Sequence, residues 1–361
     1  MSISTKYFIT GPTKLESVRE EIPAPSDGEL TLKTLRTSIC TSDLRYYFGQ
    51  RPASVLASAY PLCPFHEAVA EVVNGSGFEK GERVIPVPNI PCYIRDPKKY
   101  PSKERACVSC RPGGAGEHYC VDGLFSSSNT DGFARELFNH PASCIVKVPT
   151  EIPNDIASFA EPLSVAYESV MQAGIDRYLG DNKVTIIGSG PVAYITAVTL
   201  RALGTEKNNL CVVGVYDEQL APFKHLAETF NSRERSIKEL QYQSSVAFEC
   251  VGSNKAEFTI ADAVETLKPG GTCVLVGLSD GDIPIKTRSL LKKNAHLVGI
   301  MRSPISHYPV VLDMMKTPLV RDKLYELLVE PFSADSDGIA AAFRAALDLK
   351  VCGKVAIDWN Y

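Results

Sequence analysis

The sequence predicts an α/β protein in which a β-rich first part precedes a domain built on a doubly wound parallel sheet. Up to about residue 150, short apolar runs alternate with proline and glycine, which is typical of strands joined by turns. From Lys183 onward, short apolar strands alternate with helical patterns, which favours a parallel sheet covered on both faces. The chain has 361 residues, more than one hydrophobic core usually holds, so two domains are expected.

The individual elements follow from the spacing of apolar residues and from the turn residues between them. Strands are expected in the first part at 29–35, 68–73, 83–87 and 143–148. A helix is expected at 155–174, and the order that follows is strand 183–187, helix 191–203, strand 210–215, helix 218–229, strand 246–251, helix 256–267, turn 268–271, and strands 272–278, 296–300 and 354–358.

Composition excludes several classes of protein. The net charge is −4, and no basic stripe suggests a nucleic-acid partner. The first twelve residues lack the apolar core of a signal peptide, and no run approaches the ~20 apolar residues that span a bilayer. We therefore expect a cytoplasmic enzyme of small molecules. The eleven cysteines are spread along the chain, which favours metal ligands and buried thiols over a disulfide scaffold.

A glycine-rich turn follows the strand that ends at Ile187. The segment Gly188-Ser-Gly-Pro-Val-Ala193 has the G-x-G-x-x-A pattern and opens a helix. Glycines permit a tight turn and close approach of a pyrophosphate, and the helix N-terminus offers free N–H groups to it. The motif in this strand-turn-helix context predicts a dinucleotide site at this turn, with Gly188 and Gly190 beside the pyrophosphate.

The end of the next strand bears on the choice of cofactor. An acidic residue there would bind the ribose hydroxyls of NAD, but this chain has Gly214, followed by Tyr216 and Asp217. Absence of a carboxylate makes room for a 2′-phosphate, so NADP(H) is favoured over NAD(H). No arginine follows directly, Lys224 is distant, and Asp217 could still reach the ribose, so NAD(H) stays an alternative.

Two groups of residues suggest zinc. Cys40, His66, Glu67 and Glu161 provide the thiolate, imidazole and carboxylates of an open catalytic site. Taken alone, a cysteine or histidine is more often a core residue, and a glutamate is more often exposed to solvent, than a metal ligand. Only the co-occurrence of all four beside a dinucleotide motif favours metal binding. A second set could form a closed structural site of four thiolates, with unpaired thiols as the alternative: Cys92, Cys107, Cys110 and Cys120.

Taken together and in order, these motifs resemble the zinc-containing medium-chain dehydrogenase/reductase family. The likeness also includes Gly81-Glu-Arg-Val84, Asp131-Gly-Phe-Ala134, Glu161-Pro-Leu-Ser-Val165 and Pro269-Gly-Gly271. It implies a GroES-like catalytic domain over 1–154, a Rossmann domain over 155–300, and a segment 301–361 that returns to the first domain. Members are commonly homodimers or homotetramers, which is the expectation here.

The resemblance also implies roles for particular residues. Cys40 and His66 would be direct zinc ligands, and Glu67 the adjacent carboxylate found in the polyol dehydrogenase branch. Glu161 would be a ligand or a partner of zinc-bound water, and Ser42 would carry the hydroxyl that relays the substrate proton. The expected cofactor contacts are Gly188, Gly190, Pro191, Val192, Gly214, Tyr216 and Gly252.

Within this family the chain resembles ribitol-5-phosphate dehydrogenases on the segments 38–49, 87–89, 248–252 and 301–303. That likeness implies reduction of ribulose 5-phosphate with NADPH. Arginine replaces the histidine common in polyol dehydrogenases at residue 45, which suggests a substrate-phosphate site made by Arg45, Tyr46, Tyr47 and Arg302. The alternatives are a dehydrogenase of an unphosphorylated polyol or threonine, a zinc-independent quinone-type reductase, and a non-catalytic relative.

The cysteine cluster departs from the family pattern. Fourteen residues separate Cys92 from Cys107, and nine separate Cys110 from Cys120. The first insertion, residues 93–106, has a net charge of +3. This puts the geometry of a structural zinc in question and suggests a basic flap over the active site as one use of the insertion.

Overall fold

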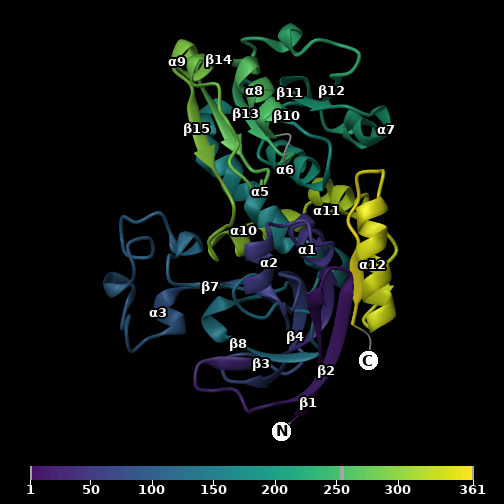
Figure 1. Ribbon diagram of the computed structural model, residues 1–361. Coiled ribbons are helices and arrows are strands. Elements are labelled where there is room, and N and C mark those ends of the chain that lie inside the picture. The colour runs from purple at the N-terminus through teal and green to yellow at the C-terminus, as the bar shows by residue number, and fades with distance from the viewer. Residues whose placement is uncertain (1, 253–255, 360–361) are drawn as a thin grey trace.

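The computed structural model describes residues 2–252 and 256–359, and it contains two large sheets linked by the long helix α5 (Ala160–Ala173) (Figure 1). The second sheet has six parallel strands in the order β12-β11-β10-β13-β14-β15. Their bounds are β10 Lys183–Ile187, β11 Leu210–Gly214, β12 Glu228–Asn231, β13 Ser244–Glu249, β14 Leu267–Leu275 and β15 His296–Gly299. This is the expected doubly wound parallel sheet.

Helices cover both faces of this sheet because successive strand residues point in opposite directions. Ile186 and Val212 belong to one core, which includes α5 and α6 (Pro191–Ala202). Ile187 and Val213 belong to a second core on the opposite face, with α8 (Ala256–Thr266). The remaining helices of this half are α7 Asp217–Leu220, α9 Thr287–Lys293, α10 His307–Met315 and α11 Pro318–Tyr325.

The first sheet combines strands from both ends of the chain. Its order is β16-β17-β3-β4-β5-β9, with β8 paired to β3. Their bounds are β3 Glu29–Ser38, β4 Glu67–Gly75, β5 Arg83–Pro86, β8 Leu137–Pro141, β9 Ile145–Lys147, β16 Phe332–Ser333 and β17 Ala356–Asp358. Strand β17 runs antiparallel to β3, with Ile357 opposite Thr37, so the C-terminal segment completes the sheet that carries the N-terminal site residues.

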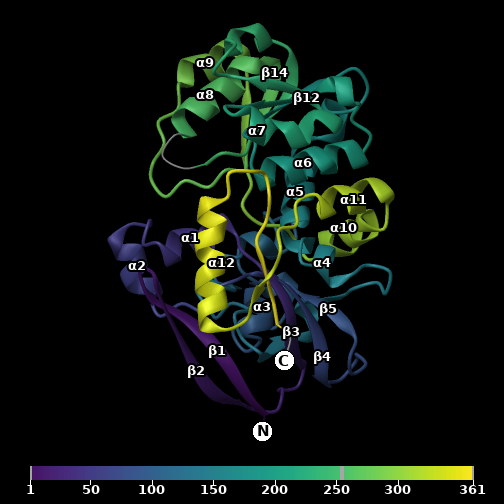
Figure 2. The ribbon, with the colours of Figure 1, turned by 90° about the vertical axis from the view of Figure 1, so that its right-hand side faces the viewer.

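Smaller elements border this sheet. They are the hairpin β1 (Ser2–Gly11) and β2 (Lys14–Ile22), the pair β6 (Asn89–Ile90) and β7 (Leu124–Phe125), and the helices α1 Thr41–Tyr47, α2 Ala53–Ala59, α3 Cys92–Arg95, α4 Asn154–Ala157 and α12 Ser336–Asp348. Figure 2 shows α12 beside the β1–β2 hairpin, while α10 and α11 lie against α5 and α6. The division at residues 154 and 300 stays a prediction: residues 307–325 pack on the nucleotide half, and residues 332–358 join the first sheet.

One predicted helix is wrong. The pattern at 218–229 suggested a single helix, but α7 ends at Leu220, a 3-10 turn covers Ala221–His225, and β12 begins at Glu228. Pro222 cannot donate a backbone hydrogen bond, which ends the α-helix, and Thr229 and Phe230 favour a strand. The β1–β2 hairpin was not predicted, because β2 is exposed on both faces and lacks an apolar alternation. Over the residues described, no helix is both long and apolar enough to cross a bilayer.

Candidate functional site

Cys40, His66 and Glu67 meet where β3 ends and β4 begins. Ser38 lies opposite Glu67 in the antiparallel ladder, so the residues just beyond these positions are neighbours. Cys40 precedes α1, and His66 follows Phe65, whose φ of 73° turns the chain into β4. One ligand atom from each of the three residues lies within 4.8 Å of the other two. The structure thus brings together three of the four residues predicted for a catalytic metal.

A serine absent from the sequence prediction orients His66. Nδ1 of His66 lies 2.8 Å from the hydroxyl of Ser127, a buried residue in the left-handed region with φ 62°. This contact leaves Nε2 as the nitrogen free to coordinate a metal, and such partners commonly fix the ring of a metal-binding histidine. Ser127 is 61 positions from His66, so no local pattern could have indicated it.

The charge of this pocket suits a cation. Burial alone would lower the pKa of His66, but Asp43, Cys40 and Glu161 raise it to about 10. Surroundings that attract a proton this strongly also attract a divalent ion. The donor set of thiolate, imidazole and carboxylate fits zinc, so the residues present fit the metal that the sequence suggests.

Glu67 is already held by two other side chains. Lys354 donates to Oε1 at 2.6 Å, and the hydroxyl of Ser38 donates to Oε2 in a very short hydrogen bond. Glu67 and Lys354 are both buried, and Lys354 comes from the segment just before β17. Glu161 lies in the first turn of α5, outside the three-residue cluster, and burial raises the pKa of its carboxyl group. Lys354 was missed because its partner is far away in the sequence.

The four cysteines of the second group also meet. Ligand atoms of Cys92, Cys107, Cys110 and Cys120 all lie within 4.8 Å of one another, close to the edges of about 3.8 Å in a tetrahedral zinc–thiolate site. Burial raises the pKa of the Cys107 thiol, but backbone N–H groups outweigh this and lower it to about 6. Burial raises the pKa of the Cys92 and Cys110 thiols, so the closed zinc site is supported by the spacing of the four sulfurs and by the readily ionised Cys107.

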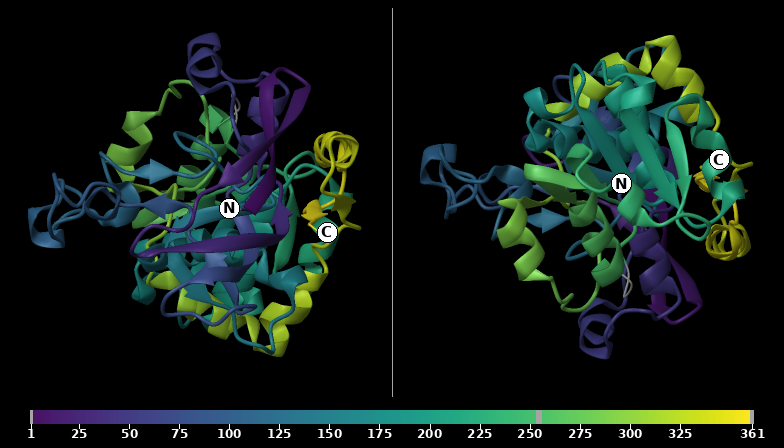
Figure 3. Two further views of the ribbon diagram at one scale, coloured as in Figure 1. Left: turned by 90° about the horizontal axis from the view of Figure 1, so that it is seen from below. Right: turned by 90° about the horizontal axis from the view of Figure 1, so that it is seen from above.

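The basic insertion belongs to the lobe that contains these cysteines. Arg95 and Lys99 pair with Asp122 at 3.0 and 2.9 Å, and Lys103 pairs with Glu117 at 3.5 Å. The lobe projects from the side of the molecule in both views of Figure 3. Most of its predicted excess charge is therefore neutralised locally, and the suggested flap over the active site receives no support from this arrangement.

The predicted cofactor motif lies at the carboxyl edge of the parallel sheet. Gly188 has a φ of 121° and lies against Val251. No atom lies within 4 Å of the position that a Cβ of Gly190 would take, so the backbone there is open to a bound pyrophosphate. Pro191 is the first residue of α6. Exposed apolar side chains gather at the same strand ends, where they could contact cofactor rings: Val192, Val215, Tyr216, Val251 and Leu278.

Arg233 supplies a cation that the sequence did not place at this edge. Its guanidinium lies over the ring of Tyr216, 4.5 Å from the centroid. Ser232 donates its backbone N–H to the carbonyl of Gly214 at 2.9 Å, so the end of β12 is fixed beside the end of β11. Within the described part of the chain, Arg233 makes no ion pair. It was missed because 218–229 was predicted as helix, which hid strand β12.

The four residues predicted to bind a substrate phosphate lie in different surroundings and have different partners. Arg45 pairs with Asp280 at 3.0 Å. The ring of Tyr46 lies under the guanidinium of Arg51, and Tyr47 stacks on Phe343 in the core, 4.2 Å between centroids. Arg302 covers Phe125 at 4.3 Å, and Phe125 in turn contacts His66.

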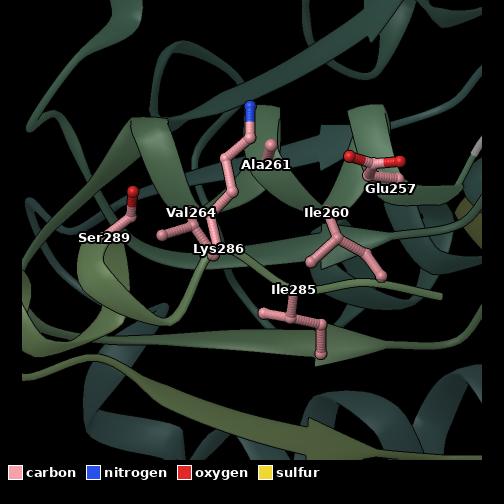
Figure 4. Close-up of a pocket in the computed structure, with 7 residues that line it drawn as sticks. All are labelled: Glu257, Ile260, Ala261, Val264, Ile285, Lys286 and Ser289. Carbon is pink, nitrogen blue, oxygen red and sulfur yellow. The ribbon is translucent and has the colours of Figure 1, made fainter.

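A small hollow elsewhere contains no site residue. Figure 4 shows it between α8 and the chain leading into α9, lined by Glu257, Ile260, Ala261, Val264, Ile285, Lys286 and Ser289. None of these residues belongs to either metal cluster or to the predicted cofactor contacts, so the hollow carries no functional argument.

Comparison with known proteins agrees with this geometry. Residues 26–150 match the alcohol dehydrogenase GroES-like domain, and residues 193–317 match the zinc-binding dehydrogenase family. The chain belongs to the zinc-binding dehydrogenases, and it is an oxidoreductase with the two-part fold expected from the sequence.

Relatives can be named more specifically. Ribulose-5-phosphate reductase 1 of Staphylococcus aureus is 30% identical over 99% of both chains. The ribulose-5-phosphate reductase of Streptococcus pneumoniae is 25% identical over 99% of this chain and 98% of its own. The crystal structure of S. aureus TarJ in complex with NADPH superposes with a TM-score of 0.81 at 26% identity, covering both chains completely.

Proposed function

We propose that the protein is a zinc- and NADPH-dependent reductase that converts ribulose 5-phosphate to ribitol 5-phosphate. The observation that carries this proposal is the similarity to ribulose-5-phosphate reductases over the full chain, at 30% identity. The intact Cys40–His66–Glu67 cluster supports catalysis over a purely structural role. Arg233 supports NADPH, because its cation lies over Tyr216 near the end of β11 and could pair with a 2′-phosphate.

When bound, zinc would supply Lewis-acid polarisation of the substrate carbonyl, and NADPH would supply the hydride. Cys40 and His66 would hold the metal, with Ser127 fixing the imidazole ring. Ser42, in the first turn of α1, would pass the proton that the reduced oxygen takes up. Lys354 would balance the charge of the buried Glu67 carboxylate.

Arg302 and Arg45 would bind the substrate phosphate. Arg302 has no carboxylate partner at ion-pair distance among the described residues, and it covers Phe125, whose ring also contacts His66. Arg45 lies three residues after Ser42 on α1, which puts the two side chains on neighbouring positions of one helix face. A phosphate held by these guanidinium groups would bring the other end of a short sugar chain toward the metal cluster.

A dehydrogenase of an unphosphorylated polyol is the second candidate. One observation favours it: Arg45 already has a carboxylate partner in Asp280, which a phosphate would have to displace. Sorbitol dehydrogenase 2 of Saccharomyces cerevisiae, 28% identical over 84% of this chain, lies within the same set of relatives.

A substrate panel separates the two candidates. Loss of NADPH absorbance would be followed with zinc-loaded enzyme and ribulose 5-phosphate, ribulose, fructose or a simple ketone. We expect kcat/KM for ribulose 5-phosphate to exceed that for ribulose by roughly 10- to 100-fold, as one or two charge-assisted hydrogen bonds would give. Equal values for both sugars would exclude the phosphate-specific function and leave the polyol dehydrogenase.

We further propose that the protein forms a homodimer or homotetramer. Strand β15 is the outer strand of the six-stranded sheet, and its free edge can pair with another chain. Light scattering on the eluting protein would distinguish these assemblies from a monomer.

A further inference from the structure

One aspartate connects the two halves of the molecule through two arginines. Asp280 accepts from Nη1 of Arg45 through Oδ2 at 3.0 Å and from Nη1 of Arg51 through Oδ1 at 2.7 Å. Nη2 of Arg45 also donates to the carbonyl of Leu278 at 2.7 Å. Each guanidinium therefore contacts a single oxygen of the carboxylate, which is weaker than a two-oxygen fork.

This cluster is largely shielded from water. The side chains of Arg45, Arg51 and Asp280 are 11%, 14% and 17% exposed. Two cations face one anion, and across the residues described neither arginine has a second carboxylate at ion-pair distance. The cluster keeps a net positive charge in a poorly hydrated place, where attraction to an anion is strong.

The cluster connects an element of the proposed metal site with an element of the proposed cofactor site. Arg45 belongs to α1, the helix that begins directly after Cys40. Asp280 follows β14. The backbone of Leu278, two residues before Asp280, lies close to Gly252: a Cβ atom added at Gly252 would lie 2.4 Å from the Leu278 carbonyl oxygen. Arg45 thus joins the metal-binding helix to the wall of the nucleotide site.

We propose that Asp280 is an internal counter-anion which the phosphate of the substrate displaces from Arg45 and Arg51, and that this competition limits the preference for phosphorylated over free sugar. This inference rests on the proposed function. A phosphate dianion offers three oxygens and twice the charge of a carboxylate, so it can engage both guanidinium groups in forked pairs. A neutral sugar cannot replace Asp280 and gains nothing from the arginines.

The displacement has a defined energetic consequence. In the free enzyme, Asp280 neutralises one of the two positive charges. It therefore reduces the repulsion between the partly buried guanidinium groups of Arg45 and Arg51. Exchange for phosphate must break the two hydrogen bonds that Asp280 accepts from Arg45 and Arg51, which lowers the apparent affinity for every anion. Removal of the Asp280 charge should therefore tighten anion binding and leave binding of neutral sugars unchanged.

The test compares Asp280→Asn with Asp282→Asn in the full-length, zinc-loaded enzyme. Asp282 is an exposed carboxylate of the same loop and has no ion pair in the described structure, so it controls for the general loss of one charge. Calorimetric titration would use inorganic phosphate, ribitol 5-phosphate and ribitol as separate probes. We expect Asp280→Asn to tighten binding of both phosphate probes roughly five- to tenfold, with Asp282→Asn within about twofold of the native protein.

Kinetics provide the second measurement. KM for ribulose 5-phosphate should fall in Asp280→Asn with kcat nearly unchanged, while the parameters for ribulose stay the same. Weaker or unchanged phosphate binding in a folded Asp280→Asn protein would overturn the inference, as would an equal effect of Asp282→Asn. If Asp280→Asn does not fold, the same titrations and kinetic measurements are made on Asp280→Ser and decide the inference.

The two proposals fail in different ways. Poor reduction of ribulose 5-phosphate by the native enzyme would reject the proposed function, yet titration with inorganic phosphate would still show whether Asp280 competes with anions. Phosphate that binds to neither the native protein nor Asp280→Asn would reject the role of Asp280 even if the reductase activity is present.

Discussion

Glu67 and Lys354 form a buried ion pair of 2.6 Å, although 287 positions separate them in the sequence. Their side chains are 1% and 8% exposed, so neither charge can be solvated if the other is removed. The pair joins β4, which begins at Glu67, to the C-terminal segment just before β17. The net charge of the metal site therefore depends on Lys354, which is not itself a metal ligand.

Replacement of Lys354 tests this dependence. Lys354→Met leaves the Glu67 carboxylate buried without its partner, so the unfolding free energy should fall by about 3 kcal/mol, and activity should fall as well. Chemical denaturation of the zinc-loaded protein measures the change. The double variant Glu67→Gln/Lys354→Met should recover part of that stability, since it removes both charges.

Lys316→Met is the matched control. Lys316 pairs with Asp313 at 2.9 Å on the exposed side of α10, and its removal should leave the unfolding free energy nearly unchanged. An equal loss of stability in both lysine variants would show that the Glu67–Lys354 pair has no special role.

A second prediction concerns the cysteine lobe. Cys110→Ser removes one of four thiolates, so the purified protein should lose about one equivalent of zinc and unfold at lower temperature. Elemental analysis would measure the metal content. Cys211→Ser, which alters a thiol outside both clusters, should retain the native zinc content; loss of zinc in both variants, or in neither, would contradict a four-thiolate site.

Cofactor choice gives a third prediction. Arg233→Ala removes the cation over Tyr216, so KM for NADPH should rise roughly tenfold or more while KM for NADH changes little. Steady-state kinetics with both cofactors measure the shift. Arg235→Ala is the control, because Arg235 already pairs with Glu239 at 2.8 Å; parallel changes for NADPH and NADH in Arg233→Ala would exclude a 2′-phosphate contact.

The buried ring of His140 makes the first domain sensitive to acid. Burial lowers its pKa from 6.5 to about 4, and its Nε2 lies 3.0 Å from the carbonyl of Val87. Because the folded pKa lies below the unfolded one, the unfolded chain binds more protons between these values. Stability is therefore full above pH 6.5 and falls as the pH drops toward 4, by about 3 kcal/mol.

His140→Gln keeps a group that can donate to Val87 but does not titrate. Denaturation across this pH range should show that the native protein loses about 3 kcal/mol more than the variant between pH 6.5 and 4, so the two curves separate on acidification. Curves that stay parallel would show that His140 does not contribute to the acid sensitivity.

Local patterns predicted the parts of the site that lie close in the sequence. The Gly188–Ala193 turn needs only a strand before it and a helix after it, and both are present. Cys40 and His66 were brought together by analogy with a family, and the structure explains their meeting through the antiparallel pairing of β3 with β4.

Long-range partners could not be predicted in this way. Ser127, Lys354 and Asp280 each act on a residue that is at least 61 positions away. Their placement depends on chain reversals and on the packing of one domain against the other, which leave no periodic signal in a single sequence. Arg233 was lost for a different reason, since a wrong helix assignment hid the short edge strand before it.

Strand β17 has a consequence for how the molecule is made. A ribosome releases Cys40, His66 and the cysteine lobe long before Lys354 and the strand that pairs with β3. The six-stranded sheet uses residues 183–299 alone and can form while the first sheet still has an open edge. Throughout that interval the Glu67 carboxylate lacks its cation, so the metal site is completed only when Lys354 and β17 have been synthesised.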